Sequence, residues 1–166
     1  MREINRDDFN FMPICVDLRD RKVLMVGGGR IALQKTRLLL GYTQSITAVA
    51  PEFLPEFRQP PLDCVRLIED GFDEKYLEGI WLLYVCTQDH GLNHRIRELA
   101  AQRRILTSVC DDPAYCDFVS PAVYRQGDLA IAVSSNGKDV LRSIAVRDRI
   151  REHVEKDILS LDDDRD

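Results

Sequence analysis

Three consecutive glycines, Gly27, Gly28 and Gly29, follow four apolar residues and precede a segment whose apolar residues have helical spacing. With Ala32 they form the pattern Gly-x-Gly-x-x-Ala, in which each small residue has a physical purpose. The first glycine permits a tight turn, the second lets a pyrophosphate approach the backbone, and the alanine lets the helix pack closely on the strand. The N–H groups and the dipole at the start of the helix also favour a phosphate. The stretch therefore predicts a dinucleotide site, although a tight strand–helix turn without a ligand has the same pattern.

Residues on both sides of this turn complete the expected cofactor site. The pyrophosphate is expected to bind the backbone N–H groups of five consecutive residues, Gly27, Gly28, Gly29, Arg30 and Ile31. A dinucleotide site usually adds an acidic residue about 20 positions further along, which accepts the ribose hydroxyls. The second apolar run ends at Ala50 and Pro51, and Glu52 comes slightly later than this rule requires. These three residues are expected to contact the cofactor without deciding between NAD and NADP, and the distance to the nearest arginine, Arg58, weakly favours NAD.

The composition is that of an ordinary globular protein. Of 166 residues, 45% are hydrophobic and 31% are charged, which suits one well-buried domain with a small appendage. No apolar run approaches the roughly 20 residues of a membrane helix, and the N-terminus lacks the apolar core of a signal peptide. The net charge of −5 does not favour nucleic-acid binding. We therefore expect a cytoplasmic protein that binds neither membranes nor nucleic acids.

The cysteines and histidines indicate neither a disulfide framework nor a metal site. The five cysteines are odd in number and include no Cys-x-x-Cys pair, so they are expected to be reduced thiols. Among them, Cys86 and Cys110 lie beside apolar segments, where a free cysteine packs as a small hydrophobe. His90 and His94 are spaced to share one helix face, but no third ligand has matching spacing, so no metal is expected.

Strand-like and helical segments alternate through the first two thirds of the chain. Strands are expected at residues 23–26, 45–49, 65–68, 81–86 and 105–109, and helices at residues 30–40 and 92–103. Shorter turns of helix are expected around residues 52–57 and 73–77. This alternation predicts an α/β fold with a doubly wound parallel sheet and right-handed crossovers.

The pattern changes after Pro113. Residues 118–125 and 128–134 are strand-like and are joined by a short connection that contains glycine, which predicts an antiparallel hairpin. One helix is expected at residues 138–159, followed by an acidic tail. We expect three parts, at residues 1–112, 113–137 and 138–166. The amphipathic helix has little chain left to pack against, so a homodimer is expected, with packing on its own hairpin as the alternative.

Short motifs follow one another in a specific order between residues 12 and 152. They are Leu-Arg-Asp-Arg-Lys-Val-Leu-Met-Val-Gly-Gly-Gly from Leu18, Val-Ala-Pro-Glu from Val49, Phe72-Asp73, Thr87 with Asn93, Ser-Val-Cys-Asp-Asp-Pro from Ser108, Phe-Val-Ser-Pro-Ala from Phe118 and Ala-Val-Ser-Ser-Asn-Gly-Lys from Ala132. This ordered set resembles the NAD-dependent precorrin-2 dehydrogenases, which occur alone or as the N-terminal module of siroheme synthase. The resemblance implies a Rossmann-like domain, a small dimerisation segment and a helical region. It also implies oxidation of precorrin-2 to sirohydrochlorin with NAD as hydride acceptor.

Asp111 matches the position of the family's catalytic aspartate. It directly follows the expected fifth strand, and ligands of doubly wound sheets bind outside the carboxyl ends of the strands. Its carboxylate is expected to accept a proton from the macrocycle or to orient the pyrrole N–H groups. The residues alone favour a structural role, in which Asp111 or Asp112 caps a turn before Pro113. Asp112 is the secondary candidate for the catalytic role. Thr87, at the end of the fourth strand, is expected to contact the cofactor, to cap the following helix, or both.

The carboxylates of a tetrapyrrole substrate require basic or N–H donors. Basic residues are concentrated on the C-terminal helix, at Lys138, Arg142, Arg147, Arg149 and Arg151. The turn before it contains Ser134, Ser135 and Asn136, which are expected to cap the helix and to bind a substrate carboxylate. The alternative for the basic residues is a solvated helix face. Lys138 and Arg142 complete the expected substrate site.

Two other functions remain open on the sequence. Some members of the resembling family also insert ferrous iron, which would make the enzyme a sirohydrochlorin ferrochelatase as well. A dinucleotide-sensing module with the same fold and no chemistry is the second alternative. A short-chain dehydrogenase is disfavoured because no tyrosine is followed by a lysine at the Tyr-x-x-x-Lys spacing.

Overall fold

The computed structural model describes residues 10–110, 112–156 and 159. These residues form two compact units. The first unit contains the described residues between Ile14 and Phe118, and the second contains those before Ile14 together with those from Val119 onward.

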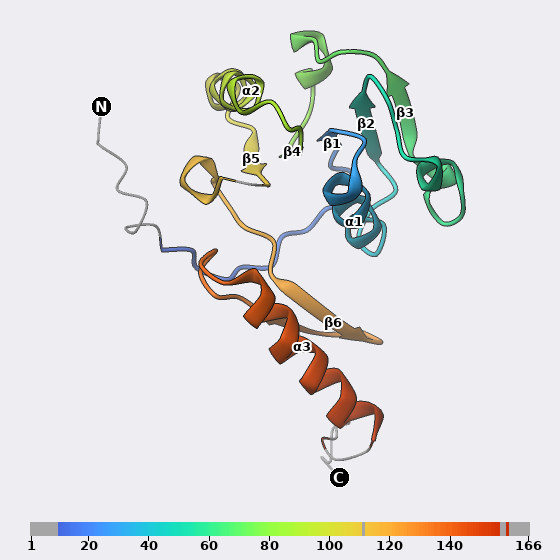
Figure 1. The fold of residues 1–166 in the computed structure, drawn as a ribbon, viewed down its shortest axis with the longest axis vertical. Helices are drawn as coiled ribbons and strands as arrows, with labels where there is room; N and C mark the ends of the chain where they lie inside the picture. Colours follow the sequence, from blue (N-terminus) through green and yellow to red (C-terminus); the bar gives the residue numbers. More distant parts are fainter. Residues whose placement is uncertain (1–9, 111, 157–158, 160–166) are drawn as a thin grey trace. The chain divides into compact units, whose positions relative to one another are not determined.

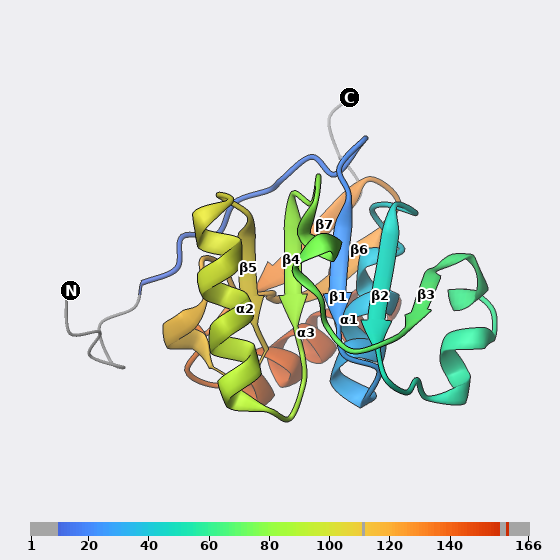
Figure 2. The ribbon, with the colours of Figure 1, turned by 90° about the horizontal axis from the view of Figure 1, so that it is seen from above.

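The first unit is built on a five-stranded parallel sheet with the order β3-β2-β1-β4-β5 (Figures 1 and 2). The strands are β1 (Val23–Val26), β2 (Ile46–Ala50), β3 (Arg66–Glu69), β4 (Leu82–Val85) and β5 (Leu106–Val109). The strand order reverses between β1 and β4, so the switch point of the sheet lies where the glycine turn follows β1. The predicted Rossmann-like sheet is confirmed, and the strand ends differ from the expected ones by about one residue.

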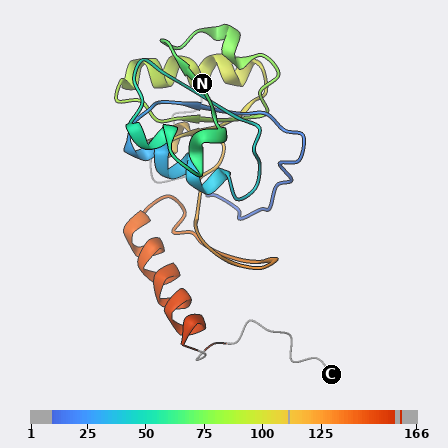
Figure 3. The ribbon, with the colours of Figure 1, turned by 90° about the vertical axis from the view of Figure 1, so that its right-hand side faces the viewer.

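Helices cover both faces of the sheet, as Figure 3 shows for α1 in blue and α2 in yellow-green. Helix α1 (Arg30–Leu39) packs Ala32 and Leu39 with Met25 of β1 in one apolar cluster. Helix α2 (His90–Gln102) packs Ile96 with Leu24 of β1 in the other. Because alternate side chains of β1 enter different clusters, all four of its residues are buried, which explains its continuous apolar run.

The second unit is an antiparallel hairpin, β6 (Ala122–Gln126) and β7 (Leu129–Val133), with helix α3 (Val140–Glu155) packed on both strands. The Arg147 guanidinium donates a hydrogen bond of 3.2 Å to the Val123 carbonyl oxygen and so ties α3 to β6. The hairpin is confirmed, and α3 does pack on its own hairpin, the alternative that the sequence left open. Among the described residues, no helix has the length and apolar character needed to cross a membrane.

Helix α3 begins at Val140, two residues later than expected. Its N-cap is Asp139, whose carboxylate accepts a hydrogen bond of 2.8 Å from the Arg142 backbone N–H. The expectation that Ser134, Ser135 and Asn136 cap this helix is therefore wrong, because an aspartate closer to the helix takes that position.

Candidate cofactor and active site

The glycine turn after β1 requires glycine at its first two positions. Gly27 has a φ of +130°, and a Cβ atom there would lie 2.5 Å from the Cys86 carbonyl oxygen. A Cβ atom on Gly28 would lie 2.0 Å from the Glu52 carbonyl oxygen. The backbone segments after β4 and β2 thus approach the turn so closely that no side chain fits between them.

Gly29 differs from its two neighbours because it faces open space. A Cβ atom built on it meets no atom within 4 Å in the described structure. Gly29 is the N-cap of α1, and no described side chain caps this helix end. The first hydrogen bond of the helix runs from Leu33 N to Gly29 O at 2.9 Å, so the N–H groups of Arg30, Ile31 and Ala32 have no helical partner. Open space beside unpartnered N–H donors is what a pyrophosphate needs, and its binding here stays a prediction.

The end of β2 lies beside this turn, as the expected ribose site requires. Gly27 N donates to Val49 O at 2.9 Å, and Leu54 N donates to Gly28 O at 3.0 Å. The connection that contains Ala50, Pro51 and Glu52 is therefore fixed to the glycine turn on both sides. Pro51 and Glu52 are exposed, and contact of the Glu52 carboxylate with a ribose hydroxyl stays a prediction.

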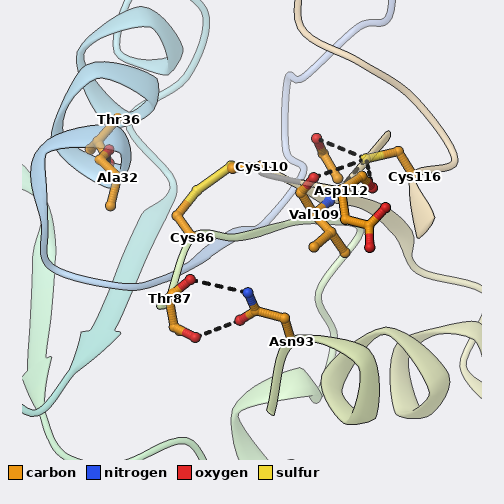
Figure 4. Close-up of a disulfide and its surroundings, with 10 residues drawn as sticks. Ala32, Thr36, Cys86, Thr87, Asn93, Val109, Cys110, Asp112 and Cys116 are labelled. Carbon is orange, nitrogen blue, oxygen red and sulfur yellow. Dashed lines mark hydrogen bonds between the residues drawn. A yellow bond between two sulfur atoms is a disulfide. The ribbon is translucent and has the colours of Figure 1, made fainter. Parts of the chain in front are cut away.

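Thr87 is fixed by α2 (Figure 4). Its hydroxyl hydrogen-bonds with the side-chain oxygen of buried Asn93, and the Asn93 amide donates to the Thr87 carbonyl oxygen at 3.1 Å. The residue that caps α2 is Asp89, whose carboxylate accepts from Leu92 N at 3.0 Å. The alternative in which Thr87 caps α2 is therefore wrong, and its contact with the cofactor stays a prediction.

Cys86 and Cys110 form a disulfide, with Cα atoms 5.2 Å apart (Figure 4). The expectation that these two cysteines are reduced thiols is therefore wrong. Their strands are parallel neighbours with Val85 opposite Val109, so the next residue of each strand lies beside the other. The free cysteines of the described chain are Cys15, Cys64 and Cys116.

Asp111, the expected catalytic residue, lies outside the described residues. The neighbouring Asp112 carboxylate lies 3.2 Å from Nε2 of His94, and its side chain does not cap the turn that follows. The His94 ring also stacks on Tyr115, with ring centroids 3.8 Å apart. No local sequence pattern pairs His94 with Asp112, because the two residues are separated by 18 positions and come together only through the fold.

The segment after Asp112 is held against β5. The Cys116 sulfur accepts a hydrogen bond from Val109 N at 3.1 Å, and the Asp117 carboxylate accepts one from Thr107 N at 3.0 Å. Arg97 of α2 pairs with Asp117 at 2.7 Å. Burial raises the pKa of the Cys116 thiol, which disfavours its thiolate. In α1, burial lowers the pKa of the half-buried Lys35.

The expected substrate residues, Ser134, Ser135, Asn136, Lys138 and Arg142, all belong to the second unit and lie around the start of α3. The Ser135 hydroxyl donates to Asp139 O at 2.7 Å and accepts from Asp139 N at 2.9 Å. Lys138 and Arg142 are exposed and form no ion pair with a described residue, which leaves both available for a carboxylate. By contrast, Arg147 and Arg151 both pair with Asp148. No group of three potential metal ligands occurs among the described histidine, cysteine and acidic residues.

Comparison with known proteins places the chain among NAD(P)-binding proteins. The sequence model of an NAD(P)-binding family matches residues 14–122. The siroheme synthases of Escherichia coli O1:K1 and Escherichia fergusonii are each 37% identical over 140 residues, which cover 84% of this chain and 31% of theirs. The chain thus spans about a third of the length of these relatives. The solved structure of SirC, precorrin-2 dehydrogenase, superposes with a TM-score of 0.68 at 26% identity, covering 89% of this chain and 70% of that one. The resemblance inferred from the ordered motifs is confirmed, and the chain belongs to this family of NAD(P)-binding proteins.

Proposed function

We propose that the protein oxidises precorrin-2 to sirohydrochlorin with NAD as the hydride acceptor. The observation that carries this proposal is the open backbone at Gly29, next to unpartnered N–H groups at the switch point of the sheet. The siroheme synthase relatives and the likeness to SirC, precorrin-2 dehydrogenase, indicate the substrate.

Two observations support NAD over NADP. The exposed Glu52 side chain belongs to the second residue after β2, in the connection that contacts the glycine turn, where its carboxylate can accept hydrogen bonds from a ribose. The 2′-phosphate of NADP would therefore be repelled by the Glu52 carboxylate. The next arginine along the chain, Arg58, already pairs with Glu69 of β3.

NAD, when bound, supplies the hydride acceptor, and this chain supplies binding and proton transfer. The glycine turn holds the pyrophosphate, and Asn93 holds Thr87 at the end of β4, where the cofactor continues along the sheet edge. Each turnover removes one hydride and one proton from the macrocycle, and we assign the proton to Asp111. We assign the substrate's carboxylates to the expected residues of the second unit, Ser134, Ser135, Asn136, Lys138 and Arg142.

We also propose a cytoplasmic homodimer in which residues 113–137 and α3 form the interface. Large apolar side chains of the second unit are exposed in the single chain, among them Leu141 at 79%, Val140 at 64% and Leu129 at 46%. A second copy would cover these side chains, since interfaces between copies of one chain commonly bury large apolar groups. Sedimentation should show a dimer for the wild type and a monomer for Leu141→Asp. A wild-type monomer would contradict this proposal without affecting the chemistry at the glycine turn.

Anaerobic incubation of the protein with precorrin-2 and NAD tests the activity. We expect NADH and sirohydrochlorin to form in equal amounts, and the absorbance of each product measures its formation. NAD binding without turnover would refute the proposed dehydrogenase activity and favour a dinucleotide-sensing module. Addition of ferrous iron to the product mixture then tests for siroheme formation.

A further inference from the structure

We propose that Cys86 and Cys110 are a reversible redox pair that sets the affinity of the adjacent glycine turn for the dinucleotide. The pair is a site for oxidation by low-molecular-weight disulfides such as glutathione disulfide. The effect on affinity rests on the proposed NAD binding, whereas the formation of the disulfide does not.

The backbone at the two strand ends holds the pair at a separation that a disulfide spans. The two residues directly follow β4 and β5, and Cys110 N donates to Val85 O at 2.9 Å. Their Cα atoms are 5.2 Å apart, within the usual range for bridged cysteines. Both residues are partly exposed, so a small reagent can reach them.

The pair is mechanically coupled to the cofactor site through Cys86. Cys86 N donates to Val26 O at 2.8 Å. The Cys86 carbonyl oxygen also lies close to Gly27, since a Cβ atom built on Gly27 would be only 2.5 Å from it. Thr87 follows directly, and Ala32 and Thr36 of α1 lie near the disulfide in Figure 4. A displacement of Cys86 therefore moves groups that border the pyrophosphate turn.

The chemistry is a balanced thiol–disulfide exchange. In oxidation, the two protein thiols lose two electrons and two protons, and the low-molecular-weight disulfide takes them up and leaves as two thiols. In reduction, two low-molecular-weight thiols supply two electrons and two protons and leave as one disulfide, the bond between the Cys86 and Cys110 sulfurs breaks, and the two protein thiols separate to non-bonded contact. The oxidised state keeps the ends of β4 and β5 together and the turn organised, so we expect it to bind NAD more tightly.

Cys116 does not compete for this reaction. Burial raises the pKa of its thiol, and Val109 occupies its sulfur with two hydrogen bonds, of 3.1 Å from the N–H and 3.2 Å to the carbonyl oxygen. The attacking species in exchange is the thiolate, which is therefore scarce at Cys116 near neutral pH. Cys15 and Cys64 are exposed and free, and they provide matched controls for any effect of an exposed thiol.

The test equilibrates the full chain with reduced or oxidised glutathione, alkylates free thiols after unfolding, and measures the NAD dissociation constant in each state. After reduction, mass spectrometry should find all five cysteines alkylated. After oxidation it should find Cys86 and Cys110 joined in one linked peptide, Cys116 alkylated, and the exposed Cys15 and Cys64 either alkylated or joined to glutathione. We expect reduction to raise the NAD dissociation constant about fivefold, because the reduced site is less well organised before NAD binds. Cys86→Ser and Cys110→Ser should each bind NAD with the weaker affinity in both buffers, and Cys15→Ser/Cys64→Ser should keep the difference.

Two results would overturn the proposal in different ways. Absence of a linked Cys86–Cys110 peptide in oxidising buffer excludes the redox pair itself. A linked peptide with equal NAD affinity in both states excludes the coupling alone. If neither state binds NAD, the proposed function fails together with the coupling, and the linked peptide still shows whether the disulfide forms. Since the two single variants remove opposite partners, a folding defect in one leaves the other to decide.

Discussion

Replacement of Gly29 by alanine separates ligand binding from folding. The backbone φ at Gly29 is −87°, which alanine readily adopts, and the new Cβ atom would meet nothing within 4 Å. The remaining cost is the poorer N-cap preference of alanine, about 1 kcal/mol. In the complex, however, the methyl group would occupy the space that a pyrophosphate needs. We expect the NAD dissociation constant to rise at least about tenfold, which corresponds to about 1.4 kcal/mol.

Gly28→Ala is the matched control, because the same methyl group meets backbone instead of open space. Its Cβ atom would lie 2.0 Å from the Glu52 carbonyl oxygen, so the chain after β2 would have to move. Overpacking of this kind lowers the free energy of unfolding by about 3 kcal/mol. For a chain of this length, that loss lowers the melting temperature by about 6–12 °C.

Thermal unfolding and NAD titration of the two variants give opposite profiles if the turn is a pyrophosphate site. Gly29→Ala should melt within a few degrees of the wild type and bind NAD weakly, whereas Gly28→Ala should show a large loss of stability. Wild-type NAD affinity in a folded Gly29→Ala protein would refute the assignment of the pyrophosphate to this turn. A large stability loss in Gly29→Ala would contradict the open space beside it.

Three further changes test other parts of the site. Asp111→Ala should lower kcat about 10²–10⁴-fold with unchanged NAD affinity in a titration, and unchanged turnover would refute its role as a base. Asp117→Ala removes the acceptor for Thr107 N and the partner of Arg97, so urea unfolding should show a loss of about 2 kcal/mol, and wild-type stability would contradict this. The pKa of the half-buried Cys116 thiol is raised in the folded protein, so the thiol of the unfolded chain ionises first as pH rises. Its contribution to stability is therefore complete below the unfolded pKa and is lost as pH rises through the folded pKa. The difference in urea midpoint between wild type and Cys116→Ala should therefore shrink above about pH 8.5, and a constant difference would refute that shift.

The sequence was sufficient for the elements in which local pattern and burial agree. Strand β1 lies between two apolar clusters, so its four residues form a continuous apolar run that predicts a strand covered on both faces. The glycine turn was also readable, because the two close approaches at Gly27 and Gly28 leave no alternative to glycine. The start of α3 could not be predicted to the residue, because the Ser-Ser-Asn turn and Asp139 both offer capping side chains within a few positions. In the structure it is the Asp139 carboxylate that accepts a hydrogen bond from Arg142 N.

The disulfide was not predicted from the sequence, although the predicted pairing of the fourth and fifth strands already implied that Cys86 lies beside Cys110. Thr87 and Asp111 were placed at one edge of the sheet because each follows a strand that ends there. One residue earlier along each strand stand Cys86 and Cys110, so the register that brings the two strand ends together also brings the two sulfurs together. An odd number of cysteines and the absence of a Cys-x-x-Cys pair describe composition and local spacing, whereas this pair spans 24 residues and depends on strand order. Once parallel pairing of neighbouring strands is predicted, the residue that follows each strand should be compared across the pair before its chemistry is assigned.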